Sequence, residues 1–130
     1  NADKINENRL ETWNKYYEAL KPLENRGGIG LPVIPKDCTH NAHMFYIKCK
    51  DLQERTAFIN YMKEQGVCCV FHYIPLHSAP AGIKYGSFEG EDYFTTRESE
   101  RLVRLPLYYG LNEEIRQSII SKVISFYTMR

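Results

Sequence analysis

The sequence predicts an α+β fold: a small, mostly antiparallel three-stranded sheet with helices packed on one face. Residues 43–50 alternate between two sets of side chains, as a strand with two different faces does. Residues 67–71 form a short apolar run that is typical of a buried strand, and residues 103–107 form a third short strand. A helical pattern over residues 51–66 joins the first two strands.

The strand–helix–strand unit limits the possible order of the strands. A right-handed crossover makes the strands at 43–50 and 67–71 parallel. Such a pair leaves space for a strand between them, and we expect residues 103–107 to fill it, antiparallel to both.

The chain length and composition indicate one ordinary globular domain over residues 1–130. The chain has 130 residues, a hydrophobic fraction of 43%, a charged fraction of 25% and a net charge of +1. One domain of this size can bury a real core, and so small a charge favours neither nucleic acid nor an anionic membrane as a partner. Cys38, Cys49, Cys68 and Cys69 do not form a secreted disulfide pattern, so we expect reduced thiols in a cytoplasmic protein. Residues 1–2 resemble an expression scar, and we expect the chain to be a piece of a longer protein.

The first helix is expected over residues 3–20, with Pro22 beyond its end. Its apolar stripe consists of Leu10, Trp13, Tyr17 and Leu20, which we expect to leave an exposed, self-associating patch. A turn follows at 26–30, because a phosphate-binding glycine loop is not completed there.

The later helices are marked by caps and apolar stripes. Asp51 and Glu54 form a capping pattern, and Gly66 is the expected stop of that helix. Its inner stripe is expected to comprise Leu52, Ile59 and Met62, with Phe58 beside it. Residues 78–94 read as a long loop with at most one helical turn, followed by a short helix at 95–102 and a last helix capped by Asn112.

Polar aromatic side chains follow the strand at 67–71, which makes His72, Tyr73 and His77 the candidate binding residues. They could be ordinary residues at the end of a strand, satisfied by the backbone or packed in the core. They could also offer hydrogen bonds and a stacking surface to a polar ligand beneath the long loop. We expect His72 and Tyr73 to leave the strand on opposite faces and His77 to return towards the same opening.

Metal and catalytic sites are weakly indicated. Cys38, His40 and His43 match no common zinc spacing, so no metal site is expected. No nucleophile–base pair is evident, and Cys68 and Cys69 lie in an apolar strand where inert thiols are expected.

Four segments carry a resemblance to a known family. They are residues 40–47 (HNAHMFYI), 66–77 (GVCCVFHYIPLH), 95–102 (TTRESERL) and 104–107 (RLPL). Together they resemble the C-terminal part of the DegT-type sugar-nucleotide aminotransferases, over nearly the whole chain.

The resemblance implies the C-terminal small domain of an enzyme of aspartate-aminotransferase fold that uses pyridoxal 5'-phosphate (PLP). A preceding N-terminal domain would carry the PLP lysine, so the fragment alone would bind no cofactor and be inactive, and the complete enzyme would be a homodimer. The implied reaction converts dTDP-4-keto-6-deoxyglucose to dTDP-4-amino-4,6-dideoxygalactose with glutamate as amine donor, in surface polysaccharide biosynthesis. His72, Tyr73 and His77 would contact this nucleotide-sugar substrate. A free-standing, non-catalytic module that binds a sugar nucleotide or a metal is the alternative.

Overall fold

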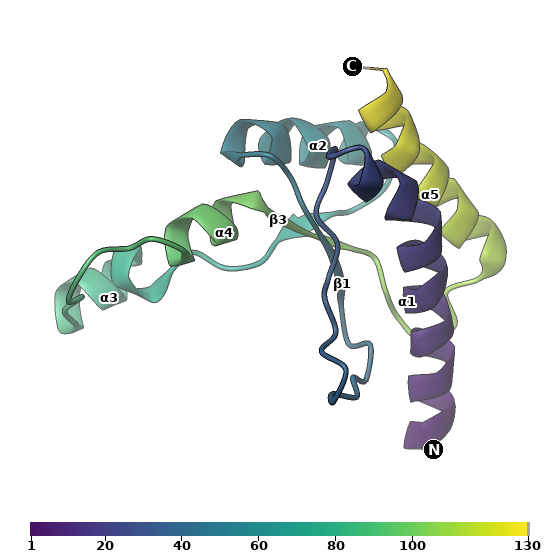
Figure 1. The fold of residues 1–130 in the computed structure, drawn as a ribbon, viewed down its shortest axis with the longest axis horizontal. Coiled ribbons are helices and arrows are strands. Elements are labelled where there is room, and N and C mark those ends of the chain that lie inside the picture. The colour runs from purple at the N-terminus through teal and green to yellow at the C-terminus, as the bar shows by residue number, and fades with distance from the viewer. Residues whose placement is uncertain (130) are drawn as a thin grey trace.

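A three-stranded sheet forms the centre of the fold, which a computed structural model describes for residues 1–129 (Figure 1). The elements in chain order are α1 (Ala2–Asn25), β1 (Phe45–Lys48), α2 (Leu52–Glu64), β2 (Val70–Phe71), the 3-10 helix η1 (Leu76–Ser78), α3 (Pro80–Tyr85), α4 (Thr95–Arg101), β3 (Leu102–Leu105) and α5 (Glu113–Thr128). The helices of this part of the chain include none with the length and apolar character needed to cross a bilayer.

The order of the strands is β1-β3-β2, and β3 is antiparallel to both neighbours. This confirms the predicted fold class and the central place of the last strand. The backbone of Gly30 adds a bridge to Lys48, with hydrogen bonds of 2.9 and 2.8 Å, on the other edge of β1. The extended segment after α1 therefore runs along β1 without becoming a full strand.

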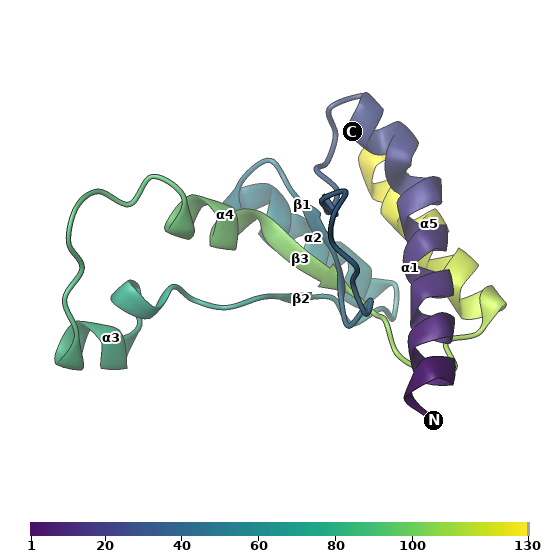
Figure 2. The same ribbon diagram turned by 60° about the horizontal axis from the view of Figure 1, so that its bottom comes forward.

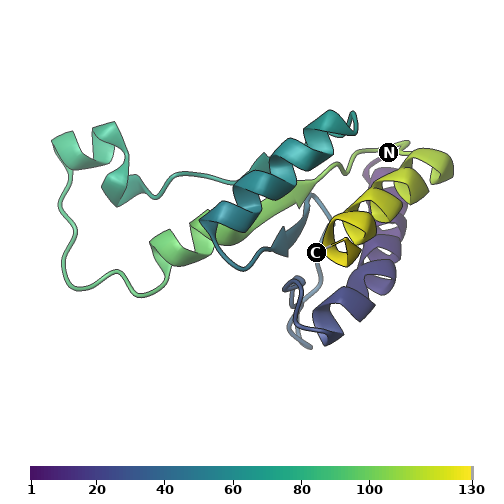
Figure 3. The same cartoon turned by 90° about the horizontal axis from the view of Figure 1, so that it is seen from above.

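The inner face of the sheet is covered by α1, α2 and α5 (Figure 3). Phe45, Ile47 and Cys49 are fully buried, which confirms the predicted alternation along β1. The Phe45 ring packs against Tyr16 of α1, with ring centroids 5.2 Å apart. Aromatic contacts of this kind stabilise a core beyond the area they bury.

The expected buried strand at 67–71 is wrong in its length and burial. Only Val70 and Phe71 form β2, and their exposed fractions are 39% and 42%. Val67 and Cys69 reach the core before the strand begins. The reason is that β2 is an edge strand, so part of its surface has no neighbour to cover it.

The first helix is longer than expected, because it continues through Pro22 to Asn25. Leu20 and Leu23 are both buried, so core packing continues on either side of the proline. Pro22 lies in the last turn of the helix, where a missing N–H interrupts little of the remaining hydrogen-bonding pattern.

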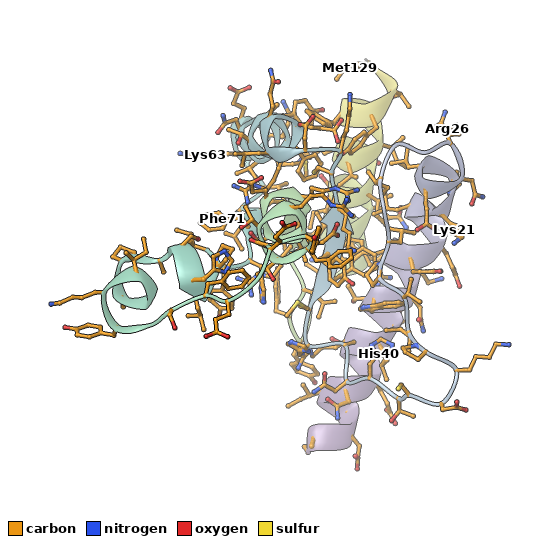
Figure 4. All side chains as sticks on the ribbon, turned by 60° about the vertical axis from the view of Figure 1, so that its left-hand side comes forward. Lys21, Arg26, His40, Lys63, Phe71 and Met129 are labelled. Carbon is orange, nitrogen blue, oxygen red and sulfur yellow. The ribbon has the colours of Figure 1, made fainter. Side chains whose placement is uncertain are left out.

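The expected exposed patch around Trp13 is also wrong. The exposed fraction of Trp13 is 6%. Its ring stacks on Tyr17 at 5.2 Å and meets His40 and Phe45 at 4.6 and 5.3 Å. Figure 4 shows His40 beside α1, on the segment that folds back over this helix. The chain itself therefore covers the stripe.

Both ends of α2 have the caps that the sequence predicts. Asp51 accepts a hydrogen bond from the backbone N–H of Glu54 at 2.8 Å. Gly66 has a φ of +77°, and the N–H of Val67 donates to the Met62 carbonyl at 2.8 Å. The expected inner stripe needs one correction, because Leu52 is 42% exposed at the first turn, before the helix reaches the core.

Residues 72–94, here called the arm, extend from the end of β2 away from the rest of the molecule (Figures 1 and 2). The arm holds two short helical pieces, η1 and α3, where the sequence predicted at most one helical turn. Its large apolar side chains are mostly exposed: Tyr73, Ile74, Leu76, Ile83, Tyr85, Phe88, Tyr93 and Phe94. The exposed apolar surface expected on α1 is therefore found on the arm.

Candidate ligand-binding site at the end of the edge strand

The outer face of the sheet presents a row of three side chains in the centre of the candidate site. Arg104 of β3 pairs with Tyr46 of β1 on one side and with Val70 of β2 on the other. Paired residues in an antiparallel sheet lie on the same face, so all three face away from the helical layer. Arg104 therefore stands in the middle of the uncovered face.

The side chain of Arg104 has no hydrogen-bond or ion-pair partner among residues 1–129. Its Nε is buried and makes no hydrogen bond, and no carboxylate of the described residues forms an ion pair with its guanidinium. Buried donors are normally satisfied, so an unpaired arginine nitrogen needs an explanation. Arg104 is not among the binding residues predicted from the sequence. An arginine between apolar neighbours in a short strand was the one available indication.

His72 follows β2 directly and is partly buried. Its Nδ1 is buried and, within the described residues, has no hydrogen-bond partner. The pKa of His72 is lowered from 6.5, first by loss of water around the ring and then by the charges of Arg104 and His43. The imidazole is therefore mainly neutral at pH 7 while no ligand is bound.

Tyr73 lies beside His72 and is 69% exposed. The two ring centroids are 4.3 Å apart, so the expectation that the rings leave the strand on opposite faces is wrong. Strand geometry ends at Phe71, and beyond it the strict alternation of side chains no longer applies. Tyr73 also lines a hollow of about 270 Å³ together with Arg55, Phe71 and Ser99.

His77 lies in the arm and is engaged there. Its Nε2 is 3.0 Å from a carboxylate oxygen of Asp92 and 3.4 Å from the hydroxyl of Thr96. The ring also packs against Phe88, with centroids 4.5 Å apart. His77 lines a separate hollow, on which neither His72 nor Tyr73 borders. The expectation that it returns towards the opening of His72 is therefore wrong.

A charged cluster joins α4 to the sheet next to this site. Glu98 lies between Lys48, at 2.8 Å, and Arg101, at 3.1 Å. The hydrogen bond from Lys48 is the main reason that the pKa of Glu98 falls to about 2. Arg101 also donates to the Cys49 carbonyl at 2.8 Å. The cluster fixes the start of β3, and with it the position of Arg104.

The thiols are divided between the core and the surface. Cys68 is exposed and precedes β2, so its expected place inside an apolar strand is wrong. Burial raises the pKa of Cys49 to about 11 and that of Cys69 to about 12, so both stay as thiols. Cys38 is exposed, while the His40 ring packs on Trp13. Over residues 1–129, no three His, Cys, Asp or Glu side chains gather as a metal site would require.

The chain does not offer the surroundings that PLP needs. A lysine that forms a Schiff base lies in a buried pocket with a phosphate cradle. No lysine of the described chain is buried. Three lysines are partly covered, and each has a partner: Lys21 pairs with Glu24, Lys48 with Glu98, and Lys122 donates to the Ser118 hydroxyl. The residues present therefore do not fit this cofactor.

Sequence comparison identifies relatives over most of the chain. The family described as DegT/DnrJ/EryC1/StrS aminotransferase matches residues 1–124. A dTDP-3-amino-3,6-dideoxy-alpha-D-galactopyranose transaminase from Aneurinibacillus thermoaerophilus is 29% identical over 124 residues, which cover 93% of this chain and 31% of that protein. The chain spans about a quarter to a third of the length of the curated relatives it matches.

Solved structures share the fold. The aminotransferase TlmJ from Streptoalloteichus hindustanus has a TM-score of 0.84 at 23% identity, over 98% of this chain and 33% of that one. NtdA from Bacillus subtilis, solved with bound cofactor PMP, has a TM-score of 0.80 at 25% identity, over 95% of this chain and 28% of that one. The small sheet with its helical layer is thus a recurrent unit of larger aminotransferases.

Proposed function

Because this chain belongs to the DegT/DnrJ/EryC1/StrS aminotransferase family, we propose that it is the C-terminal small domain of a PLP-dependent sugar-nucleotide transaminase. The length of the relatives supports a preceding domain that holds the cofactor, since this chain spans no more than about a third of them. PLP supplies the electron sink for amino transfer when it is bound in that domain. The complete enzyme is proposed to act as a homodimer.

The proposed substrate is dTDP-4-keto-6-deoxyglucose, and the proposed product is dTDP-4-amino-4,6-dideoxygalactose, with glutamate as the amine donor. The name of the Aneurinibacillus relative supports a dTDP-linked amino-dideoxygalactose, although in that protein the amino group is at position 3. Incubating the full-length enzyme with the 3-keto and the 4-keto sugar nucleotide, and assigning the product by NMR, decides between the two positions. Product from the 3-keto sugar alone would overturn the assignment to position 4.

His72 and Tyr73 are proposed to contact the nucleotide sugar, and one observation carries this role. The buried Nδ1 of His72 has no hydrogen-bond partner within residues 1–129, and the imidazole lies next to the exposed ring of Tyr73. A polar ligand would supply the missing hydrogen bond and pack against the tyrosine. His77 is proposed to support substrate binding indirectly, through the arm, because its imidazole already pairs with the Asp92 carboxylate.

The test uses the full-length enzyme and its steady-state kinetics. His72→Ala and Tyr73→Phe are expected to lower kcat/KM for the sugar nucleotide by roughly two- to hundredfold, the range of one lost hydrogen bond. PLP absorbance should be unchanged, because neither residue is proposed to hold the cofactor. Tyr109→Phe is the matched control, since Tyr109 is also exposed but lines neither the hollow beside Tyr73 nor the one beside Arg104. If both site variants keep full kinetics and lose only thermal stability, the binding role is wrong.

The assignment of the cofactor to a preceding domain has its own test. The 130-residue chain is mixed with PLP, reduced with borohydride and mapped by mass spectrometry. No lysine is expected to be labelled stoichiometrically, because none of the described lysines is buried. One lysine labelled to completion would place the cofactor within this chain.

A further inference from the structure

The outer face of the sheet holds an arginine and a histidine whose buried nitrogens have no partner among the described residues. Arg104 occupies the central strand opposite Val70 of β2, and His72 follows two residues after Val70, close enough for the Arg104 charge to lower the pKa of the imidazole. Both residues carry a buried nitrogen, Nε in Arg104 and Nδ1 in His72, that no described residue satisfies.

The surface next to Arg104 is hollowed, and its lining contains no acidic side chain. A hollow of about 180 Å³ is lined by His43, Met44, Cys68, Val70, Arg104, Leu105, Pro106 and Leu107. His43 is the second basic group there, and its Nδ1 contacts only the amide oxygen of Asn41, at 3.3 Å. Lys48, on the same face, is already neutralised by Glu98. The free positive charge on this face is therefore that of Arg104, and the two histidines beside it add N–H groups that can donate hydrogen bonds.

We propose that Arg104 and His72 together bind a phosphate group, with His43 adding a hydrogen-bond donor from the rim. The inference rests on the proposed function and extends it, because it assigns the diphosphate of the nucleotide sugar to this face of the sheet. The planar guanidinium donates two parallel hydrogen bonds to a phosphate, and the imidazole supplies a third from the edge strand. Tyr73 then lies beside the anion, where it can pack against the ligand.

A phosphate fits this arrangement better than the carboxylate of an amino donor. One arginine is sufficient for a carboxylate, whereas an arginine with two imidazole donors beside it, next to a hollow with no acidic side chain, suits a group with more oxygen atoms and a higher negative charge. The phosphate of PLP has the same chemistry as that of the nucleotide. The experiment must therefore separate the two sources.

The 130-residue chain, which has a hydrophobic core of its own, is titrated at low ionic strength with pyrophosphate, dTDP, PLP and glutamate. Binding is measured by calorimetry, and the imidazole signals of His72 are followed by NMR. Pyrophosphate and dTDP are expected to bind and to raise the pKa of His72, because the anion offsets the charges of Arg104 and His43. Glutamate and PLP should bind at least tenfold more weakly than dTDP.

Arg104→Gln is expected to weaken dTDP binding roughly tenfold or more, and Arg104→Lys less, because lysine keeps the charge but loses the paired geometry. Arg26→Gln is the matched control. It removes the same charge at the end of α1, and Figure 4 shows Arg26 on the other side of the molecule from Phe71. Circular dichroism establishes that each variant is folded. Equal loss in Arg104→Gln and Arg26→Gln, or unmoved His72 signals, would overturn the site.

Two further outcomes decide which ligand the site takes. PLP or glutamate binding as tightly as dTDP would overturn the assignment to the nucleotide.

The phosphate site and the proposed function can fail separately, because dTDP binding that depends on Arg104 can be measured in this chain without catalysis. If the full-length enzyme then fails to transaminate, the proposed function fails alone. If it transaminates while Arg104→Gln leaves dTDP binding intact, the phosphate site fails alone.

Discussion

The imidazole of His77 lies 3.0 Å from the carboxylate of Asp92, and this contact closes the base of the arm. The two residues stand at opposite ends of the loop that contains α3, and Thr96 at the start of α4 contacts both of them. Hydrogen bonds from Thr96 are the main reason that the pKa of Asp92 is lowered, so this carboxylate stays ionised. The arm buries little apolar surface, and it is held at its base by the contacts among His77, Asp92 and Thr96, here called the polar clip.

His77→Ala is expected to loosen the arm without unfolding the domain, because the side chains of the arm add little to the core. Hydrogen exchange measured by mass spectrometry should show protection reduced roughly two- to tenfold over residues 72–94, the effect of one lost hydrogen bond. His40→Ala is the control, since its ring packs on Trp13 in the body of the domain. Equal loss of protection in the two variants would show that the clip does not hold the arm.

Tyr16→Phe is expected to destabilise the whole domain by about 1–2 kcal/mol. The Tyr16 side chain is fully buried, and its hydroxyl donates to the Pro106 carbonyl at 2.8 Å, which ties α1 to the segment after β3. Removing the hydroxyl leaves that carbonyl without its donor. Urea unfolding gives the change in the free energy of unfolding. Tyr17→Phe, with only a 3.4 Å contact to Lys21 at its hydroxyl, should cost less than about 0.5 kcal/mol.

Glu98→Gln is expected to alter how stability depends on acid pH. The carboxyl has a pKa of about 2 in the folded chain against an ordinary value of 4.5, so the unfolded state binds its proton first as the pH falls. Its contribution is complete above about pH 4.5 and is lost between that pH and about 2. Because the group is partly exposed, we expect about 1–2 kcal/mol.

The measurement is chemical unfolding of Glu98→Gln and of the unchanged chain at several pH values. The unchanged chain should be the more stable at pH 7, and the difference should shrink on acidification. Glu64→Gln is the control, because Glu64 is exposed at the end of α2. A difference that is constant from pH 7 to pH 3 would contradict the role of the cluster.

Two glycine substitutions are expected to act on different parts of the molecule. Gly66→Ala places a Cβ in open space at a φ of +77°, so only backbone strain is added, about 1 kcal/mol in global unfolding. Gly82→Ala places a Cβ in steric overlap with the Leu76 carbonyl oxygen, so η1 and α3 must move apart. Thermal unfolding should respond mainly to the first variant and amide NMR signals of the arm mainly to the second. The reverse pattern would contradict this division.

Much of the fold is determined by short-range features of the sequence. Alternation along β1 identifies Phe45, Ile47 and Cys49 as core residues, because successive strand residues face opposite ways. The caps of α2 at Asp51 and Gly66 are set by side-chain and backbone chemistry within a few residues. The place of β3 between the other two strands agrees with the gap that two parallel strands joined by a helix often leave for a third strand.

Only the tertiary structure decides the features that depend on distant neighbours. The passage of α1 through Pro22 depends on Leu20 and Leu23 both reaching the core. The exposure of β2 depends on its place at the edge of the sheet, which leaves one side unpaired. Local patterns contain no information on which surface another segment will cover.

Some features of the candidate site can likewise be predicted from the sequence, and others depend on the tertiary structure. The sequence by itself identifies His72 and Tyr73 as polar residues at the end of a strand. The pairing of Val70 with Arg104 is what brings an arginine that was not predicted close to His72, and this register is fixed only when β2 and β3 assemble. The contact with Asp92, likewise, removes His77 from that opening. The local chemistry of the chain therefore sets which side chains are available, and the packing of strands distant in sequence decides which of them meet.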